Sequence, residues 1–350
     1  MTSSSATVAP QWCRRRDRIG AAAVFIAIAA VCAVGPASAD AGAVQPVPPA
    51  SSTELQREPI RPLPISVSLN PRKVALGRSL FSDPALSRDG TVSCASCHAL
   101  DSGGTDHRQH SMGLHRTEGA VNAPTVFNVG FNFRQFWDGR AETLEAQIDG
   151  PLQSPGEMGS DWRDVLPRLR GLKDYAAGFA QTYSDGISAD NVRNAIAEFE
   201  RSLITPNARF DRFLRGDSAA LTDEEKAGYL KFKSYGCISC HQGVNVGGNM
   251  FQRMGVIGDY FADRGNVTQA DYGRFNVTKD EADRYTFKVP SLRNVELTAP
   301  YFHDGSAQTL DEAVAIMAKY QLGRQLPPQD RDQLVKFLKT LTGVYGGQAP

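Results

Sequence analysis

The strongest constraint in this sequence is a five-residue pattern that occurs twice. Residues 94–98 read Cys-Ala-Ser-Cys-His, and residues 237–241 read Cys-Ile-Ser-Cys-His. This spacing suits covalent attachment of a c-type haem, because two thiols can add to the two vinyl groups of one porphyrin while the adjoining histidine binds its iron. We therefore predict two haem c groups. The predicted attachment residues are Cys94, Cys97, His98, Cys237, Cys240 and His241.

Other uses of these cysteines fit the pattern less well. Of the six cysteines, Cys13 and Cys32 lie near the N-terminus, so the other four all belong to the two motifs. Four cysteines in an exported protein would ordinarily form two disulfides, and Cys-x-x-Cys pairs also bind zinc or act as thioredoxin-like redox pairs. A histidine directly after each pair, and about 140 residues between the pairs, favour haem attachment.

The first 39 residues have the order of a secretory signal peptide. Four arginines within residues 14–18 precede the apolar run 19–34, which is followed by Ala-Ser-Ala at 37–39. We expect cleavage after Ala39 and a periplasmic protein, with an uncleaved membrane anchor as the alternative. Residues 40–64 contain six prolines and are predicted to form an extended linker.

Composition and charge exclude some classes of protein. A hydrophobic fraction of 41% and a charged fraction of 22% are typical of globular chains, and 350 residues suffice for two domains. Without residues 1–39 the chain has 34 basic and 37 acidic residues. This balance does not indicate nucleic-acid binding, which requires a strongly basic face.

Helical patterns dominate the rest of the chain. Residues 188–204 place their apolar side chains on one face, with Ser188 as a candidate N-cap. The predicted capping boxes pair Thr222 with Glu225 and Thr309 with Glu312. The apolar face of a last helix consists of Leu334, Phe337, Leu338 and Leu341. We find no convincing alternation typical of strands.

These patterns predict a mainly α protein made of two cytochrome c-like haem domains related by duplication. Each motif stands near the start of a helical region. We place the N-terminal haem domain at residues 65–210 and the C-terminal haem domain at 211–350.

Three further segments resemble a known family. Residues 122–128 read Asn-Ala-Pro-Thr-Val-Phe-Asn, residues 136–141 read Phe-Trp-Asp-Gly-Arg-Ala, and residues 289–294 read Val-Pro-Ser-Leu-Arg-Asn. They resemble the bacterial dihaem cytochrome c peroxidases, a family that also includes the MauG branch, whose members mature a tryptophan cofactor in another protein. The resemblance extends from about residue 69 to residue 343.

The resemblance implies two unequal haems on either side of a haem-bridging interface. His98 would bind the iron of a peroxidatic haem, and His241 that of an electron-receiving haem. Met317 would be the sixth ligand of the second haem, where a soft thioether raises the reduction potential. Read alone, Met317 would more simply fill a helix core. A tyrosine takes this role in the MauG branch, so Met317 favours a peroxidase.

The resemblance also implies roles for residues near the first haem and between the haems. Trp137 would assist electron transfer, Glu157 would be the acid and base for peroxide cleavage, and Gln147 would position it. A calcium ion would bind the side chain of Asn122 and the backbone carbonyls of Thr298 and Pro300. Without the resemblance, these would be a core tryptophan, polar surface residues and ordinary turns.

The sequence departs from the family on the distal side of the first haem. Well-known members have a histidine directly after a Ser-x-Gly segment, whereas here residues 111–113 are followed by Leu114 and only then by His115. One residue of loop spans at most about 3.6 Å, so we expect His115 to bind the iron in the resting state. The alternative is a first haem that is five-coordinate or water-bound, in an enzyme that is active without prior reduction. Weaker candidates are His107 and His110.

Together these features predict a periplasmic peroxidase that reduces hydrogen peroxide to water with electrons from a small cytochrome c or cupredoxin. Two alternatives belong to other classes: a MauG-like maturation enzyme, and a dihaem cytochrome that only transfers electrons. The sequence leaves a homodimer open.

Overall fold

The structure is a computed structural model, and it describes residues 58–350. The predicted signal peptide at 1–39 and most of the predicted linker at 40–64 lie outside the described residues. No helix between residues 58 and 350 combines the length and the apolar composition needed to cross a lipid bilayer.

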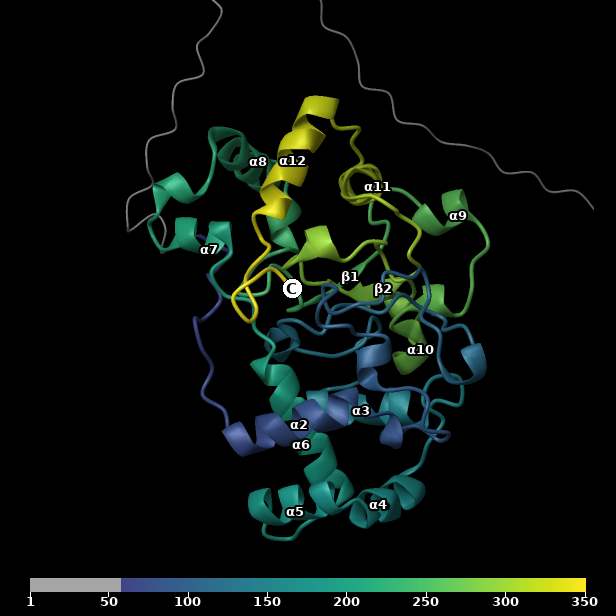
Figure 1. Cartoon of the computed structure of the whole chain (residues 1–350). Helices are drawn as coiled ribbons and strands as arrows, with labels where there is room; N and C mark the ends of the chain where they lie inside the picture. Colours follow the sequence, from purple (N-terminus) through teal and green to yellow (C-terminus); the bar gives the residue numbers. More distant parts are fainter. Residues whose placement is uncertain (1–57) are drawn as a thin grey trace, which may run out of the picture. The chain divides into compact units, whose positions relative to one another are not determined.

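Helices make up most of the regular structure (Figure 1). The α-helices are α2 (Pro71–Ser82), α3 (Leu144–Gln153), α4 (Trp162–Gly171), α5 (Lys173–Thr182), α6 (Ala189–Ser202), α7 (Arg209–Leu214), α8 (Asp223–Ser234), α9 (Tyr260–Arg264), α10 (Phe275–Thr278), α11 (Leu310–Leu322) and α12 (Pro328–Lys339). Two short strands, β1 (Phe251–Arg253) and β2 (Thr286–Lys288), pair antiparallel, with Phe251 opposite Lys288.

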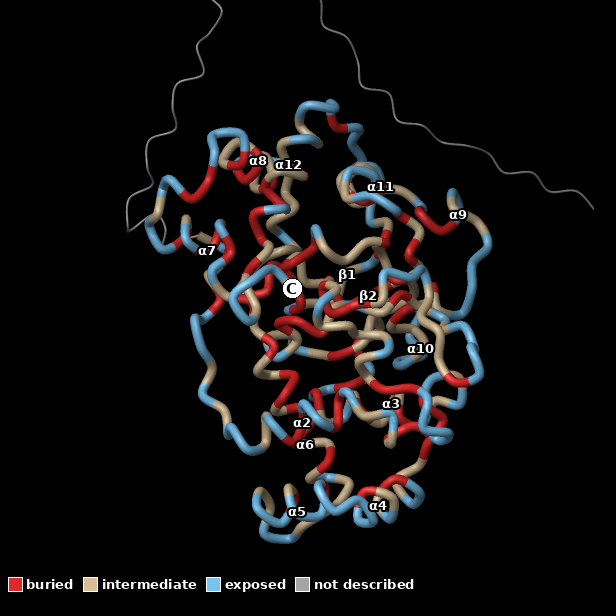
Figure 2. Tube along the Cα trace, in the orientation of Figure 1, coloured by how far each residue is buried: buried red, intermediate tan, exposed pale blue. Residues whose placement is uncertain are grey.

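The first half of the described chain is built around the crossing of α2 and α6. At the crossing point a Cβ atom on Gly77 would lie 1.9 Å from the carbonyl oxygen of Ala195, so only glycine allows the two backbones to approach this closely. One turn away, Phe81 meets Phe199 edge to face at 5.3 Å between ring centroids. Both rings are fully buried, and Figure 2 shows the buried stretches of these helices in red.

The second half repeats this arrangement with α8 and α12. A Cβ atom on Gly228 would lie 2.0 Å from the carbonyl oxygen of Gln333, which again requires glycine at the crossing. Phe232 and Phe337 pack in the adjoining core, with 5.1 Å between their ring centroids. Each helix pair therefore brackets one Cys-x-x-Cys-His motif, which follows α2 in the first half and α8 in the second.

One asparagine from each half forms a hydrogen bond to the same threonine. Asn128 and Asn294 both adopt left-handed backbone conformations, with φ of 62° and 59°. The side-chain amide of Asn128 donates to the hydroxyl of Thr205 at 2.8 Å, and that of Asn294 donates to the same hydroxyl at 3.1 Å. All three residues are buried, so the two halves are joined by hydrogen bonds that exclude water.

The mainly α, two-part cytochrome c-like architecture predicted from the sequence is thus confirmed. The exact boundary between residues 210 and 211 stays a prediction. Residues 58–64 extend along the second half, where Ile60 belongs to its core and Leu63 is also buried.

A buried ion pair holds this extended segment in place. The guanidinium of Arg293 donates to a carboxylate oxygen of Asp211 at 2.7 Å, and neither side chain is exposed to solvent. Arg293 also donates to the carbonyl of Arg61 at 3.0 Å, and the backbone N–H of Leu63 donates to Asp211 at 3.3 Å. The pair therefore links the Val-Pro-Ser-Leu-Arg-Asn segment to the start of the described chain.

The local predictions can be compared with the helices observed. The predicted helix at 188–204 is α6, and Ser188 caps it by accepting the N–H of Asn191. Thr222 and Glu225 form the full capping box of α8. The box predicted for α11 is only half formed: Thr309 accepts the N–H of Glu312, but the Glu312 carboxylate accepts from Gln308. The sequence shows no strand-like alternation, and the two strands observed, β1 and β2, are only three residues long, which is too short to produce such a pattern.

Candidate functional site

The two Cys-x-x-Cys-His motifs have the same backbone conformation. Each opens with a single 3₁₀ turn, Cys94–Ser96 in one half and Cys237–Ser239 in the other. In each turn the histidine N–H donates to the carbonyl of the first cysteine at 3.0 Å. All four thiols are free rather than paired in disulfides, as attachment to a porphyrin requires.

Both motif histidines are oriented by a carbonyl of the following loop. The Nδ1 atom of His98 lies 3.2 Å from the carbonyl oxygen of Gly104, and that of His241 lies 3.4 Å from the carbonyl oxygen of Val246. Because a carbonyl only accepts, the proton resides on Nδ1 and the lone pair on Nε2 is free to bind a metal. Surrounding protein lowers the pKa of both rings, to about 4 for His241, so each is neutral and able to act as a ligand.

A cavity of about 500 Å³ adjoins the second motif. Cys237, Cys240 and His241 line it, and so does Met317 from α11. The lining is mostly aliphatic and aromatic, and its volume lies in the range of roughly 300–1,000 Å³ found for cofactor pockets. Thiols, a neutral imidazole and a thioether therefore surround one apolar space, and this donor set fits a haem c.

The same cavity extends to residues of the first half. Trp137 and Asn122 line it, together with Thr298 and Pro300 from the second half. The indole N–H of Trp137 donates to the backbone carbonyl of Asn122 at 2.9 Å, which fixes the ring between the two halves. The structure thus brings together the predicted tryptophan, the predicted calcium ligands and the second haem motif.

The side chain of Asn122 is compatible with an ion at this place. It is 5% exposed, and its amide nitrogen donates to the carbonyl of Arg108 at 2.8 Å. Among residues 58–350 its side-chain oxygen accepts no hydrogen bond, so this oxygen is free for a hard cation.

Glu157 lies near the first motif, and neither Glu157 nor Gln147 lines this cavity. Gln147 is on α3, and Glu157 is in the turn that follows, where its carbonyl accepts the N–H of Leu114 at 2.8 Å. The Glu157 side chain reaches solvent from a recess where protein atoms displace much of the water, which raises the pKa of the carboxyl. The Ser154 side chain and the charge of Arg140 oppose this shift.

The charge of Glu157 acts on Cys97, which shows that the carboxylate lies near the first motif. The pKa of the Cys97 thiol is raised, first by burial and to a smaller extent by the nearby carboxylates, Glu157 among them. No side-chain hydrogen bond joins Gln147 to Glu157 in the part of the chain that the structure describes. The positioning role of Gln147 therefore stays a prediction.

His115 is exposed, whereas its neighbour is buried. The His115 side chain is 76% exposed, and its Nδ1 atom lies 3.9 Å from a carboxylate oxygen of Asp89. Leu114 is 2% exposed. The weaker candidates have other partners, since His107 Nδ1 lies 3.0 Å from the carbonyl of Ala299, and His110 Nδ1 lies 3.1 Å from Glu118. Binding of His115 to the first haem stays a prediction.

Sequence reasoning missed a buried acid beside the first motif. Glu200 on α6 is 6% exposed, and one of its carboxylate oxygens has no hydrogen-bond partner. Burial raises the pKa of Glu200 to about 8. Burial and then the Glu200 charge raise the pKa of Cys94, which places the carboxyl near the attachment site. The sequence did not indicate that Glu200 is buried, because an isolated glutamate on a helix is usually solvated.

A second missed group surrounds His303. Asp271, His303 and Asp304 have ligand atoms within 4.8 Å of one another, a separation that a metal ion could bridge. The guanidinium of Arg264 already bonds to both carboxylates, at 2.7 Å in the case of Asp271. His303 Nε2 lies 2.7 Å from the other oxygen of Asp271. The group is therefore an ion-pair network, with its positive charge supplied by arginine.

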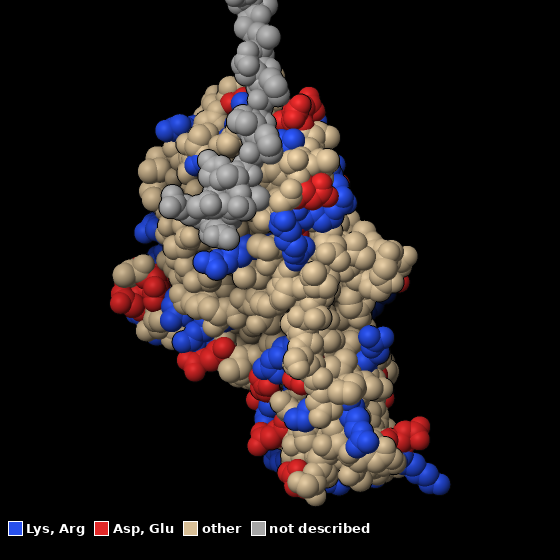
Figure 3. All heavy atoms as spheres, turned by 90° about the vertical axis from the view of Figure 1, so that its left-hand side faces the viewer, with Lys and Arg blue, Asp and Glu red and all other residues tan. Residues whose placement is uncertain are grey.

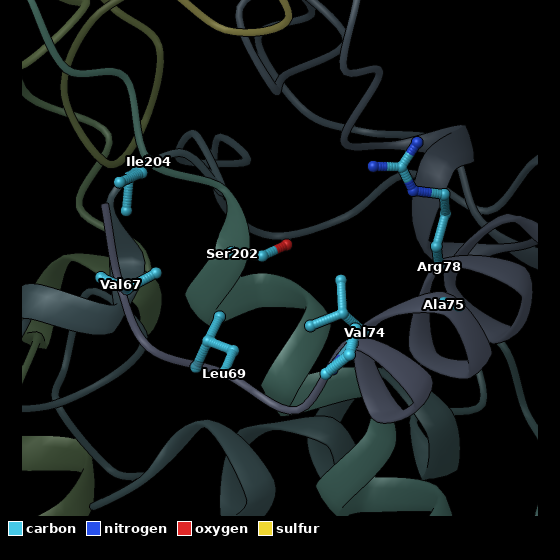
Figure 4. A pocket seen from close by; sticks show the side chains of 8 residues that line it. Val67, Leu69, Val74, Ala75, Arg78, Ser202 and Ile204 are labelled. Carbon is cyan, nitrogen blue, oxygen red and sulfur yellow. The ribbon is translucent and has the colours of Figure 1, made fainter. Parts of the chain in front are cut away.

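A further pocket of about 660 Å³ is lined by residues of α2, by Val67 and Leu69 before it, and by Ser202 and Ile204 at the end of α6 (Figure 4). Its lining is aliphatic apart from Ser202 and Arg78. None of the predicted haem, calcium or acid–base residues lines this pocket.

Comparison with known proteins now places the chain. The model of the di-haem cytochrome c peroxidase family matches residues 71–219. Cytochrome c551 peroxidase of Nitrosomonas europaea is 45% identical over 287 residues, which are 82% of this chain and 84% of that protein. The chain belongs to the dihaem cytochrome c peroxidase family.

Other members of the family agree with this placement. Cytochrome c peroxidase Ccp of Escherichia coli is 48% identical over 84% of this chain, and the match spans 63% of that longer protein. Methylamine utilization protein MauG of Methylorubrum extorquens is 34% identical. The crystal structure of a MauG-like protein associated with microbial copper homeostasis superposes with a TM-score of 0.69 at 31% identity, covering 81% of this chain and 93% of that one.

Family membership confirms three of the sequence predictions. The chain is an oxidoreductase that acts on peroxide, it belongs to a family with two haems, and it resembles the named peroxidases more strongly than the MauG proteins.

Proposed function

We propose that the protein is a periplasmic enzyme that reduces hydrogen peroxide to two waters, using two protons and two electrons from a small reduced cytochrome c or cupredoxin. The observation that carries this proposal is the cavity in which the second haem motif and Met317 face one apolar space. When bound, the two haems supply the redox chemistry: one receives donor electrons and the other reduces peroxide.

Met317 is the proposed sixth ligand of the electron-receiving haem. It lines the cavity from α11 and packs against an aromatic cluster that includes Tyr260 and Phe287. A neutral thioether in an apolar environment favours the ferrous state and so raises the potential. Methionine, rather than the tyrosine of the MauG branch, supports donor oxidation over maturation of a partner protein.

Glu157 is the proposed acid and base near the first motif. Heterolytic cleavage of the peroxide bond needs one proton taken from one oxygen and one delivered to the leaving oxygen. A carboxyl whose pKa is raised by its recess exchanges protons more readily near neutral pH than a solvated one. Gln147 would orient this carboxyl or the peroxide.

Trp137 and a calcium ion are the proposed elements between the haems. The hydrogen bond from the Trp137 indole to the Asn122 carbonyl joins the aromatic ring to the segment whose side-chain oxygen would bind calcium. Loss of the ion would therefore disturb the position of the ring.

The experiment that tests the function is stopped-flow oxidation of a reduced small cytochrome c by the purified dihaem protein and hydrogen peroxide. We expect two donor molecules oxidised per peroxide. A variant with Cys237 and Cys240 both changed to alanine serves as the control and should lose the reaction. Absence of peroxide-dependent oxidation with both cytochrome and cupredoxin donors would contradict the proposal.

A related experiment tests whether the enzyme rests in a closed state. If His115 binds the first haem, the oxidised protein contains two low-spin ferric haems, and His115→Gly converts one to high spin and removes any activation lag. Electron paramagnetic resonance distinguishes the two cases. A high-spin first haem in the unaltered protein would show that His115 stays in the exposed position seen here.

A further inference from the structure

The cavity at the second motif has an unusual set of charges. Among residues 58–350, the lining contains no aspartate, glutamate or arginine, and Lys288 is its one lysine. The other polar lining groups are amides, hydroxyls, the two motif thiols, the Trp137 indole and the histidines His241 and His303. The ammonium group of Lys288 therefore faces a mostly apolar space in which no carboxylate of residues 58–350 opposes it.

Lys288 is held in this position by β2. The residue is 7% exposed, and its backbone N–H donates to the carbonyl of Trp137 at 2.8 Å. Within residues 58–350 the ammonium group of Lys288 makes no ion pair and no hydrogen bond. Burial alone lowers its pKa to about 8, with no nearby carboxylate to oppose the shift.

A buried ammonium without a partner is unfavourable, and proteins ordinarily pair such a group with an anion. Arg293, the other buried residue of this charge among residues 58–350, follows that rule by pairing with Asp211. For Lys288 the missing anion has to come from the occupant of the cavity. A haem fits this requirement, because it carries two propionate carboxylates on an apolar ring.

We propose that Lys288 binds a propionate of the haem attached to Cys237 and Cys240, and so orients that haem and raises its reduction potential. This inference rests on the proposed placement of the haem in the cavity. The ammonium charge disfavours the additional positive charge of the ferric state, so its presence favours reduction. Through its backbone bond to Trp137, Lys288 also ties the propionate edge to the segment between the two halves.

The test is the midpoint potential of the methionine-ligated haem, measured by spectroelectrochemistry on the holoprotein together with the number of haems per chain. In Lys288→Met the reduction equilibrium should shift at least tenfold toward the ferric state, which is about 59 mV for a one-electron couple. Lys288→Arg keeps the charge and should shift the equilibrium less than threefold. The matched control is Lys336→Met on α12, which removes a lysine paired with Glu224 and Asp332 at the surface.

Each outcome decides the proposal. A lowered potential in Lys288→Met but not in Lys288→Arg supports it, as does loss of one haem in the first variant only. An unchanged potential in Lys288→Met, or an equal defect in both Lys288 variants, overturns it, because the charge is then not what the haem requires. If the unaltered protein holds no haem at this motif, the haem count shows that the proposed function itself has failed.

Discussion

The two halves of this protein share a frame but differ in the charges around it. In both, a glycine lets two helices cross closely beside a motif, and a loop carbonyl orients the motif histidine. Near the first motif lie two carboxyls with raised pKa, Glu157 and Glu200. Beside the second there is an apolar cavity whose described lining includes Lys288 and Met317. The repeated frame thus surrounds both motifs, and the residues beside it differ in the way that our proposal requires, with proton chemistry in the first half and electron transfer in the second.

The charged residues on the surface do not show the same difference between the two halves. On the face seen in Figure 3, lysines and arginines are interspersed with acidic residues across both halves.

The largest expected effect comes from removing the two attachment cysteines of the first motif. Changing Cys94 and Cys97 together to alanine should reduce the haem content from two per chain to one and abolish peroxide turnover, because the proposed ligand Met317 would leave the second haem without an open site. Haem content is measured by the pyridine haemochrome method and by intact mass. A protein that still holds two haems would contradict the assignment of the first motif.

The proton chemistry of the first half can be removed without removing its haem. Glu157→Gln should lower peroxide turnover by about two to four powers of ten, the usual effect of losing a general acid or base. Both haem spectra should stay unchanged. Glu142→Gln is the matched control, since Glu142 is 73% exposed and pairs with Arg134. A decrease of less than threefold would mean that another group transfers the protons.

Breaking the buried ion pair tests whether the stability of the second half depends on its link to residues 58–64. Arg293→Met leaves the Asp211 carboxylate buried without a partner, which should lower the free energy of unfolding by about 3–5 kcal/mol. Adding Asp211→Leu should restore much of this loss, because no unpaired charge remains. Urea unfolding followed by circular dichroism measures both, and equal stability of the single and double variants would contradict the explanation.

The buried acid of the first half predicts a pH dependence. The pKa of Glu200 is about 8 in the folded protein and about 4.5 when solvated, so the folded state binds the proton more tightly. Its contribution to stability is complete below about pH 4.5 and is lost as the pH rises toward 8. Glu200→Gln should therefore flatten the decline in unfolding free energy between pH 5 and pH 8. An identical pH profile in the variant would show that Glu200 is not protonated in the fold.

The sequence predicted those parts of the site that are local in the chain. The motifs, the N-cap Ser188 and the capping box of α8 depend on residues within five positions of each other, so their spacing is informative. Lys288 and Glu200 could not be found in this way, because what distinguishes them is the absence of a partner after folding. Family resemblance named Trp137, and only the structure showed its bond to the Asn122 carbonyl.

The single hydroxyl of Thr205 has a consequence for cooperativity. Asn128 and Asn294 each hold a left-handed backbone, a conformation that costs a non-glycine residue on the order of 1 kcal/mol and persists only while its surroundings enforce it. Because both side chains depend on the same oxygen atom, local melting of either half withdraws support from the other. The two halves should consequently lose their structure in one calorimetric transition, although each has its own core and its own haem motif.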